Sequence, residues 1–247
     1  MSYILRNNNS SDEKARARGL SEDEIAENAR VLIVAGSETT ATQLGGATYY
    51  LLVNRDKYDI LVAEIRGAFA SEEEITIASV NRLEYLIAVL SESFRMYPPV
   101  PVGLDRVVPE NGETVEGYFL PPKTVVSVHH WSSYQCAQNF SEPQRFLPER
   151  WLPSVNTTDP RFANDKRDVL QPIAVGPRNC IGKNLAYAEM RLILTRLLYN
   201  YDLELRPESS DWPNQRIFTL WEKGDLMVKV TPRELPYGSV SRAPSTA

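Results

Sequence analysis

The chain has 247 residues, a length that indicates one or two domains, and its apolar fraction of 43% is sufficient for a sizeable core. A formal net charge of -5 creates no global basic field, so nucleic acid is not an expected partner. Two cysteines exclude a disulfide scaffold and fit a reducing compartment. No apolar run reaches the roughly 18 residues that a membrane-spanning helix needs.

The N-terminal half is predicted to be helical. Ser21 and Glu24 form a capping-box pattern, which predicts a long helix that ends at about Val53. The centre of this helix, residues 31–36, is apolar on all sides, so we expect it to be buried. Two shorter helices are predicted next, over about 55–69 and 80–96.

Small and polar residues follow the apolar centre of the long helix. Ala35 and Gly36 would let a flat ligand lie against the helix, although glycine costs about 1 kcal/mol relative to alanine in a helix. The Thr39 hydroxyl can bond to a carbonyl one turn back and open a local bulge, and together with Glu38 it can relay protons. The alternative is a packing notch lined by hydroxyl groups.

A charged cluster is predicted between the third helix and a later irregular stretch. Glu92 and Arg95 are three residues apart and therefore face the same side of a helix. As an exposed pair they would contribute little. Arg150 lies among apolar and proline residues of the aperiodic stretch 131–170, where a planar guanidinium could fix the backbone against the helix. These three residues are predicted to form a buried structural triad.

The C-terminal half alternates short strands and turns. Strands are expected over 100–128, and a hairpin is expected over 219–231 with its turn at Gly224. His129 and His130 are adjacent and have no metal-ligand spacing around them. We therefore predict that both histidines are surface or strand residues.

Cys180 lies in the sequence P-I-A-V-G-P-R-N-C-I-G, directly before a predicted helix. Gly176 allows a tight turn, and Gly182 lets the backbone approach a ligand closely. The helix would present its positive end to the sulfur, which favours a thiolate, and Arg178 could pair with a carboxylate. These features suit a flat, anionic cofactor, and a thiolate is the axial ligand with which haem iron cleaves O–O bonds.

Other interpretations of this loop were weighed. The spacing from Gly176 to Gly182 is one residue too long for a phosphate-binding loop, and Asn184 stands where that loop needs a hydroxyl. Cys136 offers no zinc-ligand pattern with Cys180. A lone free cysteine is more often a small buried hydrophobe. The loop by itself therefore leaves a structural cysteine open.

Taken together, the motifs resemble the C-terminal half of a cytochrome P450. G-P-R-N-C-I-G resembles the cysteine-ligand loop of that family, A-G-S-E-T-T its oxygen-binding motif, and Glu92, Arg95 and Arg150 its Glu-Arg-Arg triad. The resemblance covers about 19–233 and looks most like fungal secondary-metabolism enzymes of the trichothecene C-15 hydroxylase type. It implies a mainly α fold with small β-sheets. The implied organisation is a polar segment 1–20, a partial P450 domain 21–233 and a loose tail 234–247.

The resemblance also implies a set of site residues. Haem b would be the cofactor, with Cys180 as its iron ligand and with Arg178 and Arg106 paired to its propionates. Glu38 and Thr39 would be the catalytic pair that delivers protons during dioxygen activation. Further haem contacts are expected at Ala35, Gly36, Ile173, Ile181, Gly182 and Ala186, where Ile173 replaces the phenylalanine usual in the family. A substrate pocket is expected at Val100, Val102, Leu104, Phe218 and Thr219.

The implied activity is that of a haem-thiolate monooxygenase acting on a hydrophobic small molecule. Electrons would come from NADPH through NADPH-cytochrome P450 reductase, which would dock near the basic residues Arg178 and Lys183. A full-length family member would sit on the cytosolic face of the endoplasmic reticulum through an N-terminal anchor, and we expect this chain to be truncated. Two alternatives are a haem-thiolate isomerase or dehydratase, and a fragment that binds no haem.

Overall fold

The computed structural model describes residues 6–8, 10–16 and 18–234. Its internal contacts divide the chain into two units, 1–39 and 40–247, with the boundary inside helix α2 (Glu22–Val53). The expected loose tail lies outside the described residues except for its first position, Glu234. In the part of the chain that the structure describes, no helix is both long and apolar enough to cross a bilayer.

The first unit contains α1 (Glu13–Arg16) and the N-terminal part of α2. The predicted capping box is confirmed: the Ser21 N–H donates to the Glu24 carboxylate at 2.8 Å, and the Glu24 N–H donates to the Ser21 hydroxyl at 3.2 Å. The predicted burial of 31–36 is wrong, because residues 31–34 are between 57% and 69% exposed. Burial needs covering elements, and the described residues of this unit provide α1, a single helical turn, for that purpose.

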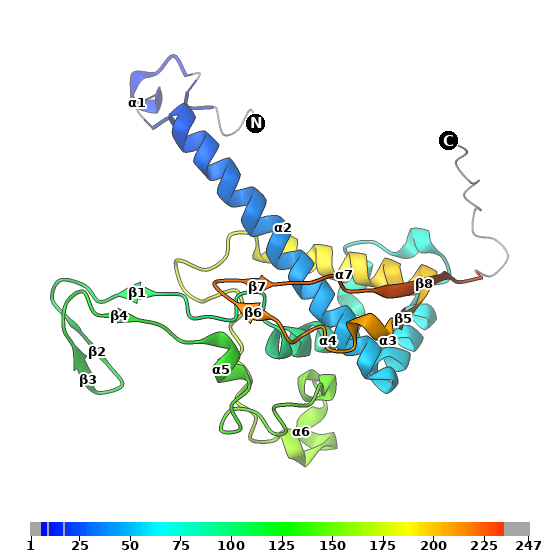
Figure 1. Ribbon diagram of the computed structural model, residues 1–247. Helices are drawn as coiled ribbons and strands as arrows, with labels where there is room; N and C mark the ends of the chain where they lie inside the picture. Colours follow the sequence, from blue (N-terminus) through cyan, green and yellow to red (C-terminus); the bar gives the residue numbers. More distant parts are fainter. Residues whose placement is uncertain (1–5, 9, 17, 235–247) are drawn as a thin grey trace. The chain divides into compact units, whose positions relative to one another are not determined.

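The second unit is built on four helical segments whose apolar faces share one core. Figure 1 shows α3 (Arg55–Ala68), α4 (Glu84–Met96) and α7 (Lys183–Asn200) gathered beside the C-terminal part of α2. Leu61, Leu86 and Leu198 have no exposed surface and belong to one apolar cluster. The remaining helical turns are short: η1 (Glu72–Glu74), η2 (Ser79–Arg82), α5 (His130–Tyr134), η3 (Pro148–Trp151), α6 (Val155–Thr158), η4 (Pro160–Phe162), η5 (Arg167–Val169) and η6 (Pro207–Ser209).

Helix α4 begins later than its sequence pattern predicts. The segment expected to start near residue 80 first forms the 3₁₀ turn η2, and the α-helix starts at Glu84. The Glu64 carboxylate of α3 accepts the backbone N–H groups of Tyr85 at 2.8 Å and Leu86 at 3.0 Å. A carboxylate from a neighbouring helix thus satisfies the first donors of α4 and sets its N-terminus.

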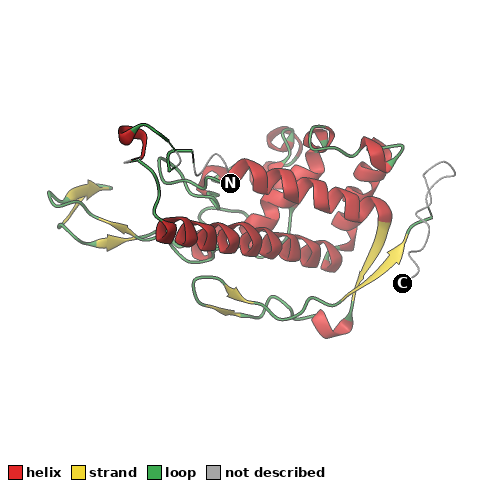
Figure 2. Ribbon diagram, turned by 90° about the horizontal axis from the view of Figure 1, so that it is seen from above, coloured by secondary structure: helices red, strands yellow, loops and turns green. Residues whose placement is uncertain are grey.

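The described strands form two-stranded antiparallel sheets at the margins of the helices, as Figure 2 shows. The pairs are β1 (Arg106–Val107) with β4 (Val125–Val126), β2 (Glu113–Val115) with β3 (Tyr118–Leu120), β5 (Tyr201–Leu205) with β8 (Val228–Pro232), and β6 (Arg216–Ile217) with β7 (Trp221–Glu222). The expected fold class, mainly α with small β-sheets, is confirmed.

The predicted hairpin around Gly224 is wrong. Strand β7 turns back onto β6, with Ile217 opposite Trp221, so the turn falls at 218–220. Strand β8 instead pairs with β5, directly after α7. The Gly224 carbonyl accepts the indole N–H of Trp212 at 2.9 Å, which ties this glycine to the loop before β6. The glycine is a turn signal, but the strand pairs depend on tertiary partners that this signal does not indicate.

Candidate functional site

The cysteine loop is closed by backbone hydrogen bonds. The Cys180 N–H donates to the Ile173 carbonyl at 3.2 Å, and the Asn179 N–H donates to the Gly176 carbonyl at 3.1 Å. Gly176 has φ 82°, the left-handed conformation that favours glycine, so the turn predicted there is confirmed. Helix α7 begins three residues after Cys180. The thiol is free and exposed, so it is open to an external ligand and is no buried structural cysteine.

The other predicted haem contacts near the loop fall into two groups. Ile173 and Ala186 are half-buried and pack against the main core, which fixes both ends of the loop. Ile181 is 95% exposed and Arg178 is exposed. A Cβ added to Gly182 would come 3.8 Å from the Cys180 sulfur. The loop thus has an anchored side and a side that presents Cys180, Ile181 and Arg178 outward.

A cavity of about 570 Å³ adjoins the start of this loop. Its walls are mostly apolar and include Leu104, Val128 and Val175, while Arg106 and His130 bring polar groups to it. Arg106, a predicted site residue, therefore lines the same cavity as the start of the cysteine loop. The prediction for His130 is wrong: the residue is only 8% exposed, lies in α5 and lines this cavity. His129 is exposed, as expected.

The predicted triad is buried and its members are in contact. Glu92, Arg95 and Arg150 have no exposed surface. Arg95 donates from Nε and Nη2 to the two carboxylate oxygens of Glu92 at 2.9 and 2.8 Å, and Arg150 Nε donates to the same carboxylate at 3.3 Å. Burial alone would raise the pKa of Glu92, but the adjacent Arg95 and Arg150 charges hold it below its ordinary value. Glu92 is therefore a buried anion.

The triad extends into a larger network than the sequence indicates. Asp165, whose side chain is 1% exposed, forms an ion pair with Arg150 and accepts the Ser141 N–H at 2.7 Å. The indole N–H of Trp151 donates to Glu92 at 2.8 Å. Asp165 lies in the aperiodic stretch, and no spacing rule connects it to Arg150, so sequence reasoning missed it.

Tyr134 connects this network to the cysteine loop. Arg95 Nη1 donates to the Tyr134 carbonyl at 2.9 Å, and the Tyr134 hydroxyl accepts the Gln171 N–H at 3.0 Å. The Gln171 carbonyl in turn accepts the N–H of Ala174 in the loop at 3.1 Å. Burial raises the pKa of Tyr134, so its phenol stays neutral. One short chain of hydrogen bonds therefore connects the buried triad to the cysteine loop, although the two are far apart in the sequence.

The proton-relay motif keeps helical geometry. The Thr39 hydroxyl donates to the Ala35 carbonyl at 2.7 Å, as predicted for a threonine bonded one turn back. The expected bulge is not present, because α2 is continuous through these residues. Glu38 and Thr39 are half-buried, whereas Ala35 and Gly36 are exposed. A Cβ added to Gly36 would meet nothing within 4 Å.

The predicted substrate-pocket residues are only partly brought together. Val100 and Val102 are half-buried, and Leu104 lines the cavity beside Arg106. Phe218 is 68% exposed and Thr219 is also exposed, at the tip of the β6–β7 hairpin. That hairpin is held to the start of the 98–104 segment by the Trp221 indole N–H, which donates to the Pro98 carbonyl at 2.7 Å.

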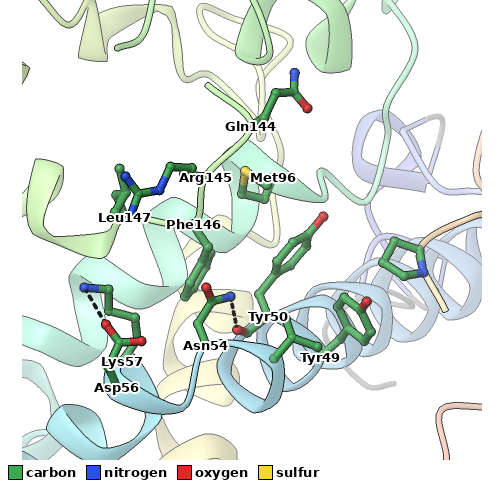
Figure 3. Close-up of a pocket in the computed structure, with 12 residues that line it drawn as sticks. Tyr49, Tyr50, Asn54, Asp56, Lys57, Met96, Gln144, Arg145, Phe146 and Leu147 are labelled. Carbon is green, nitrogen blue, oxygen red and sulfur yellow. Dashed lines mark hydrogen bonds and ion pairs between the residues drawn. The ribbon is translucent and has the colours of Figure 1, made fainter. Parts of the chain in front are cut away.

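A second cavity, of about 460 Å³, lies away from the cysteine loop and is shown in Figure 3. Tyr50 and Phe146 stack on one wall with ring centroids 5.4 Å apart, and Lys57 pairs with Asp56 at 3.1 Å on another. Burial raises the pKa of Tyr50 to about 12. None of the residues that line this second cavity was predicted from sequence, and its lining contains no cysteine or histidine to ligate iron.

The donor set fits a metal that arrives inside a macrocycle. Across the described residues, no group of three or more His, Cys, Asp or Glu side chains could hold a metal ion. The exposed Cys180 thiol could bind the iron, the apolar cavity could cover one part of the macrocycle, and Arg106 at that cavity could pair with its carboxylates. These residues fit haem.

Comparison with known proteins agrees with this geometry. The sequence model of the cytochrome P450 family matches residues 1–229. A cytochrome P450 monooxygenase (astA) of Talaromyces wortmannii is 49% identical over 94% of this chain and 45% of its own length. A trichothecene C-4 hydroxylase of Trichoderma arundinaceum is 47% identical over 94% of this chain and 46% of its own length. The chain spans about half the length of these relatives, and it belongs to the cytochrome P450 family.

Proposed function

We propose that this chain supplies the haem-thiolate half of a monooxygenase. The protein would insert one oxygen atom of dioxygen into an unactivated C–H bond of a hydrophobic secondary metabolite. The observation that carries this proposal is the exposed Cys180 thiol, presented before α7 by a loop whose backbone is closed on Ile173. Membership of a family whose fungal relatives are named monooxygenases supports the reaction type.

Haem supplies the redox chemistry when it is bound; the protein supplies its ligand, its charge partners and its walls. Cys180 would bind the haem iron as a thiolate, and Arg178 and Arg106 would pair with the haem carboxylates. Ile173 and Ala186 keep the loop seated on the core, so the sulfur is held by a rigid support. The network through Tyr134 adds a second restraint on the loop.

Proton delivery is assigned to Glu38 and Thr39. The Thr39 hydroxyl donates a hydrogen bond to the Ala35 carbonyl in the structure, so the hydroxyl oxygen can still accept a further hydrogen bond. Rotation about one side-chain bond would release that proton toward a ligand. A carboxylate at the preceding position provides the group that re-protonates the site from solvent.

The remaining parts of the proposal concern substrate, donor and location. Val100, Val102, Leu104, Phe218 and Thr219 are proposed to line the substrate site. NADPH-cytochrome P450 reductase would dock where Arg178 and Lys183 stand exposed beside the thiol. The full-length protein would lie on the cytosolic face of the endoplasmic reticulum.

The ligand assignment is tested by adding haemin to the purified chain and recording the spectrum of the reduced, carbon-monoxide-bound form. Cys180→Ser should lose the thiolate-type absorption band. Cys136→Ser is the matched control, since Cys136 is half-buried and outside the loop, and it should keep the band. A thiolate-type band that survives Cys180→Ser would overturn the assignment.

The same preparation separates the rival functions. A chain that takes up no haemin supports the haem-free fragment. In the full-length enzyme, Thr39→Ala should keep haem but release peroxide, so that product formed per NADPH consumed falls. Equal coupling in the variant and the parent would exclude Thr39 from proton delivery. Product formed without consumption of NADPH or dioxygen would instead indicate an isomerase or dehydratase.

A further inference from the structure

His130 is a buried titratable residue of the cavity beside the cysteine loop, and the proposed function does not use its chemistry. It is the first residue of α5, and its ring stacks on Tyr134 with centroids 5.4 Å apart and planes 10° apart. The residue is 8% exposed and lines the same 570 Å³ cavity as Arg106, Ala174 and Val175. An imidazole is thus held rigidly at the wall of a cavity that adjoins the Cys180 loop.

The hydrogen bond of His130 fixes its tautomer. Nδ1 lies 3.0 Å from the Val100 carbonyl oxygen, which can only accept, so Nδ1 carries the proton. In the neutral ring, Nε2 is then an acceptor with a lone pair. Since the ring lines the cavity and its Nδ1 edge is committed to Val100, the Nε2 edge is the one left for a ligand.

Arg106 provides the complementary charge. Its Nη1 donates to the Asp105 carbonyl at 2.9 Å and to the Leu104 carbonyl at 3.4 Å, which holds the guanidinium at the cavity. Nε and Nη2 make no hydrogen bond to the described residues. A planar guanidinium with unused donors is the side chain best suited to a carboxylate.

We propose that His130 and Arg106 together bind one carboxylate of the cofactor, and that His130 takes up one proton from solvent when they do so. This inference rests on the proposed function. The carboxylate arrives as an anion and meets a neutral ring whose Nε2 offers a lone pair, so the two would repel. One added proton converts the contact into a charge-assisted N–H···O hydrogen bond.

The surrounding charges set the direction of this coupling. Without a ligand, burial lowers the pKa of His130, and the neighbouring His129 lowers it further. The ring is therefore neutral at pH 7. Arg106, Asp168 and Tyr134 are the other titratable groups that line the cavity. A bound anion adds a negative charge beside the ring and favours its protonated form. Asp168 contributes a negative charge in both states.

The arrangement also connects the cofactor carboxylate to the iron ligand. His130 stacks on Tyr134, the Tyr134 hydroxyl accepts the Gln171 N–H, and Gln171 bonds to Ala174 of the loop. A protonated His130 would therefore hold the carboxylate, α5 and the start of the loop together. His130 acts here as a cofactor-binding residue and not as a catalytic one.

The test measures dissociation constants of the 247-residue chain for haemin and for haemin dimethyl ester, which lacks free carboxylates, at pH 6.5, 7.5 and 8.5. Both probes share the iron–thiolate bond, so the ratio of their constants isolates the carboxylates. In the parent chain, we expect the dissociation constant for haemin divided by that for the ester to rise with pH. The rise should be up to about tenfold per pH unit, as uptake of one proton requires.

Three variants make the result specific. His130→Phe keeps a ring to stack on Tyr134 but has no nitrogen. It should therefore weaken the binding of haemin at pH 6.5 and leave the affinity for the ester unchanged. His130→Gln keeps a donor and should recover part of the affinity with no pH dependence. His129→Gln is the matched control, because His129 is exposed and does not line this cavity. It should keep the rise of the ratio with pH, with a slight shift because His129 no longer lowers the pKa of His130.

The outcomes separate the two proposals. No haemin binding by the parent chain overturns the proposed function, and this inference with it. Haemin that binds through Cys180 with a pH-independent ratio to the ester overturns this inference alone. An equal loss of haemin and ester affinity in His130→Phe would likewise overturn it, since that result describes a purely structural ring.

Discussion

The Glu92–Arg95–Arg150 cluster and the Cys180 loop are both charged or reactive regions, but they are stabilised in opposite ways. Every side chain of the cluster is buried and finds its partners within the chain. The loop is closed by backbone hydrogen bonds, while Cys180, Arg178 and Ile181 stay exposed. The cluster is therefore complete without a ligand, whereas the loop presents groups whose partner must come from outside.

The largest effect should come from breaking the cluster. Arg95→Ala leaves the buried Glu92 carboxylate with Arg150 as its cationic partner and removes the donors to the Tyr134, Pro143 and Arg145 carbonyls. We expect a loss of about 3–5 kcal/mol in the free energy of unfolding, measured by urea denaturation, or a failure to fold.

The control for that measurement is Arg145→Ala, because the Arg145 side chain is 62% exposed and its ion-pair partner among the described residues is Glu142, at the surface. It should change stability by less than about 1 kcal/mol. Similar losses for Arg95→Ala and Arg145→Ala would show that the buried cluster does not support the scaffold.

Sequence reasoning predicted the parts of the molecule that local rules control. The capping box at Ser21, the glycine turn at Gly176 and the pairing of Glu92 with Arg95 all follow from spacings of a few residues. The pairing with Arg150 has no such spacing; it was predicted from an arginine placed among apolar and proline residues, and the family resemblance pointed to the same three residues.

The missed features depend on partners far along the chain. Glu64 moves the start of α4, Asp165 joins Arg150, and strand β8 pairs with β5, and none of these has a local signal. His130 was missed because adjacent histidines suggest exposure, whereas one of them turns inward at the start of α5.

A second prediction tests whether Asp165 belongs to the cluster. Asp165→Asn keeps the shape of the side chain but removes the charge opposite Arg150, so we expect a loss of about 1.5–3 kcal/mol by urea denaturation, as for a hydrogen bond to a charged group. Asp202→Asn is the control, since Asp202 is 50% exposed in its pair with Arg66 and should cost less than about 1 kcal/mol. Equal costs would remove Asp165 from the buried network.

A third prediction concerns the pH dependence of stability that arises from His130, beside the cysteine loop. In the ligand-free chain, the pKa of His130 is held below 6.5 by burial, so the unfolded chain binds the proton more readily. The free energy of unfolding should therefore fall as pH drops below about 6.5, with a slope of at most about 1.4 kcal/mol per pH unit from this group. His130→Gln should have a smaller slope between pH 7.5 and 5.5 than the parent. Identical slopes would mean that His130 is not held neutral.

The smallest effect should come from the iron ligand itself. Without haem, Cys180→Ser should change the free energy of unfolding by no more than about 0.5 kcal/mol, because the thiol is exposed and the loop is closed by backbone atoms. With haemin at one hundred times its dissociation constant, binding should stabilise the parent chain by about 2.7 kcal/mol, since a ligand that binds only the folded state shifts the equilibrium by mass action. Cys180→Ser should gain less at the same haemin concentration, because its oxygen is a poorer axial ligand than a thiolate. The difference between the two gains, followed by urea denaturation with and without haemin, measures what Cys180 contributes through the cofactor. A large loss in Cys180→Ser without haemin would instead make Cys180 a structural residue of the loop, and the contrast with the buried cluster would no longer hold.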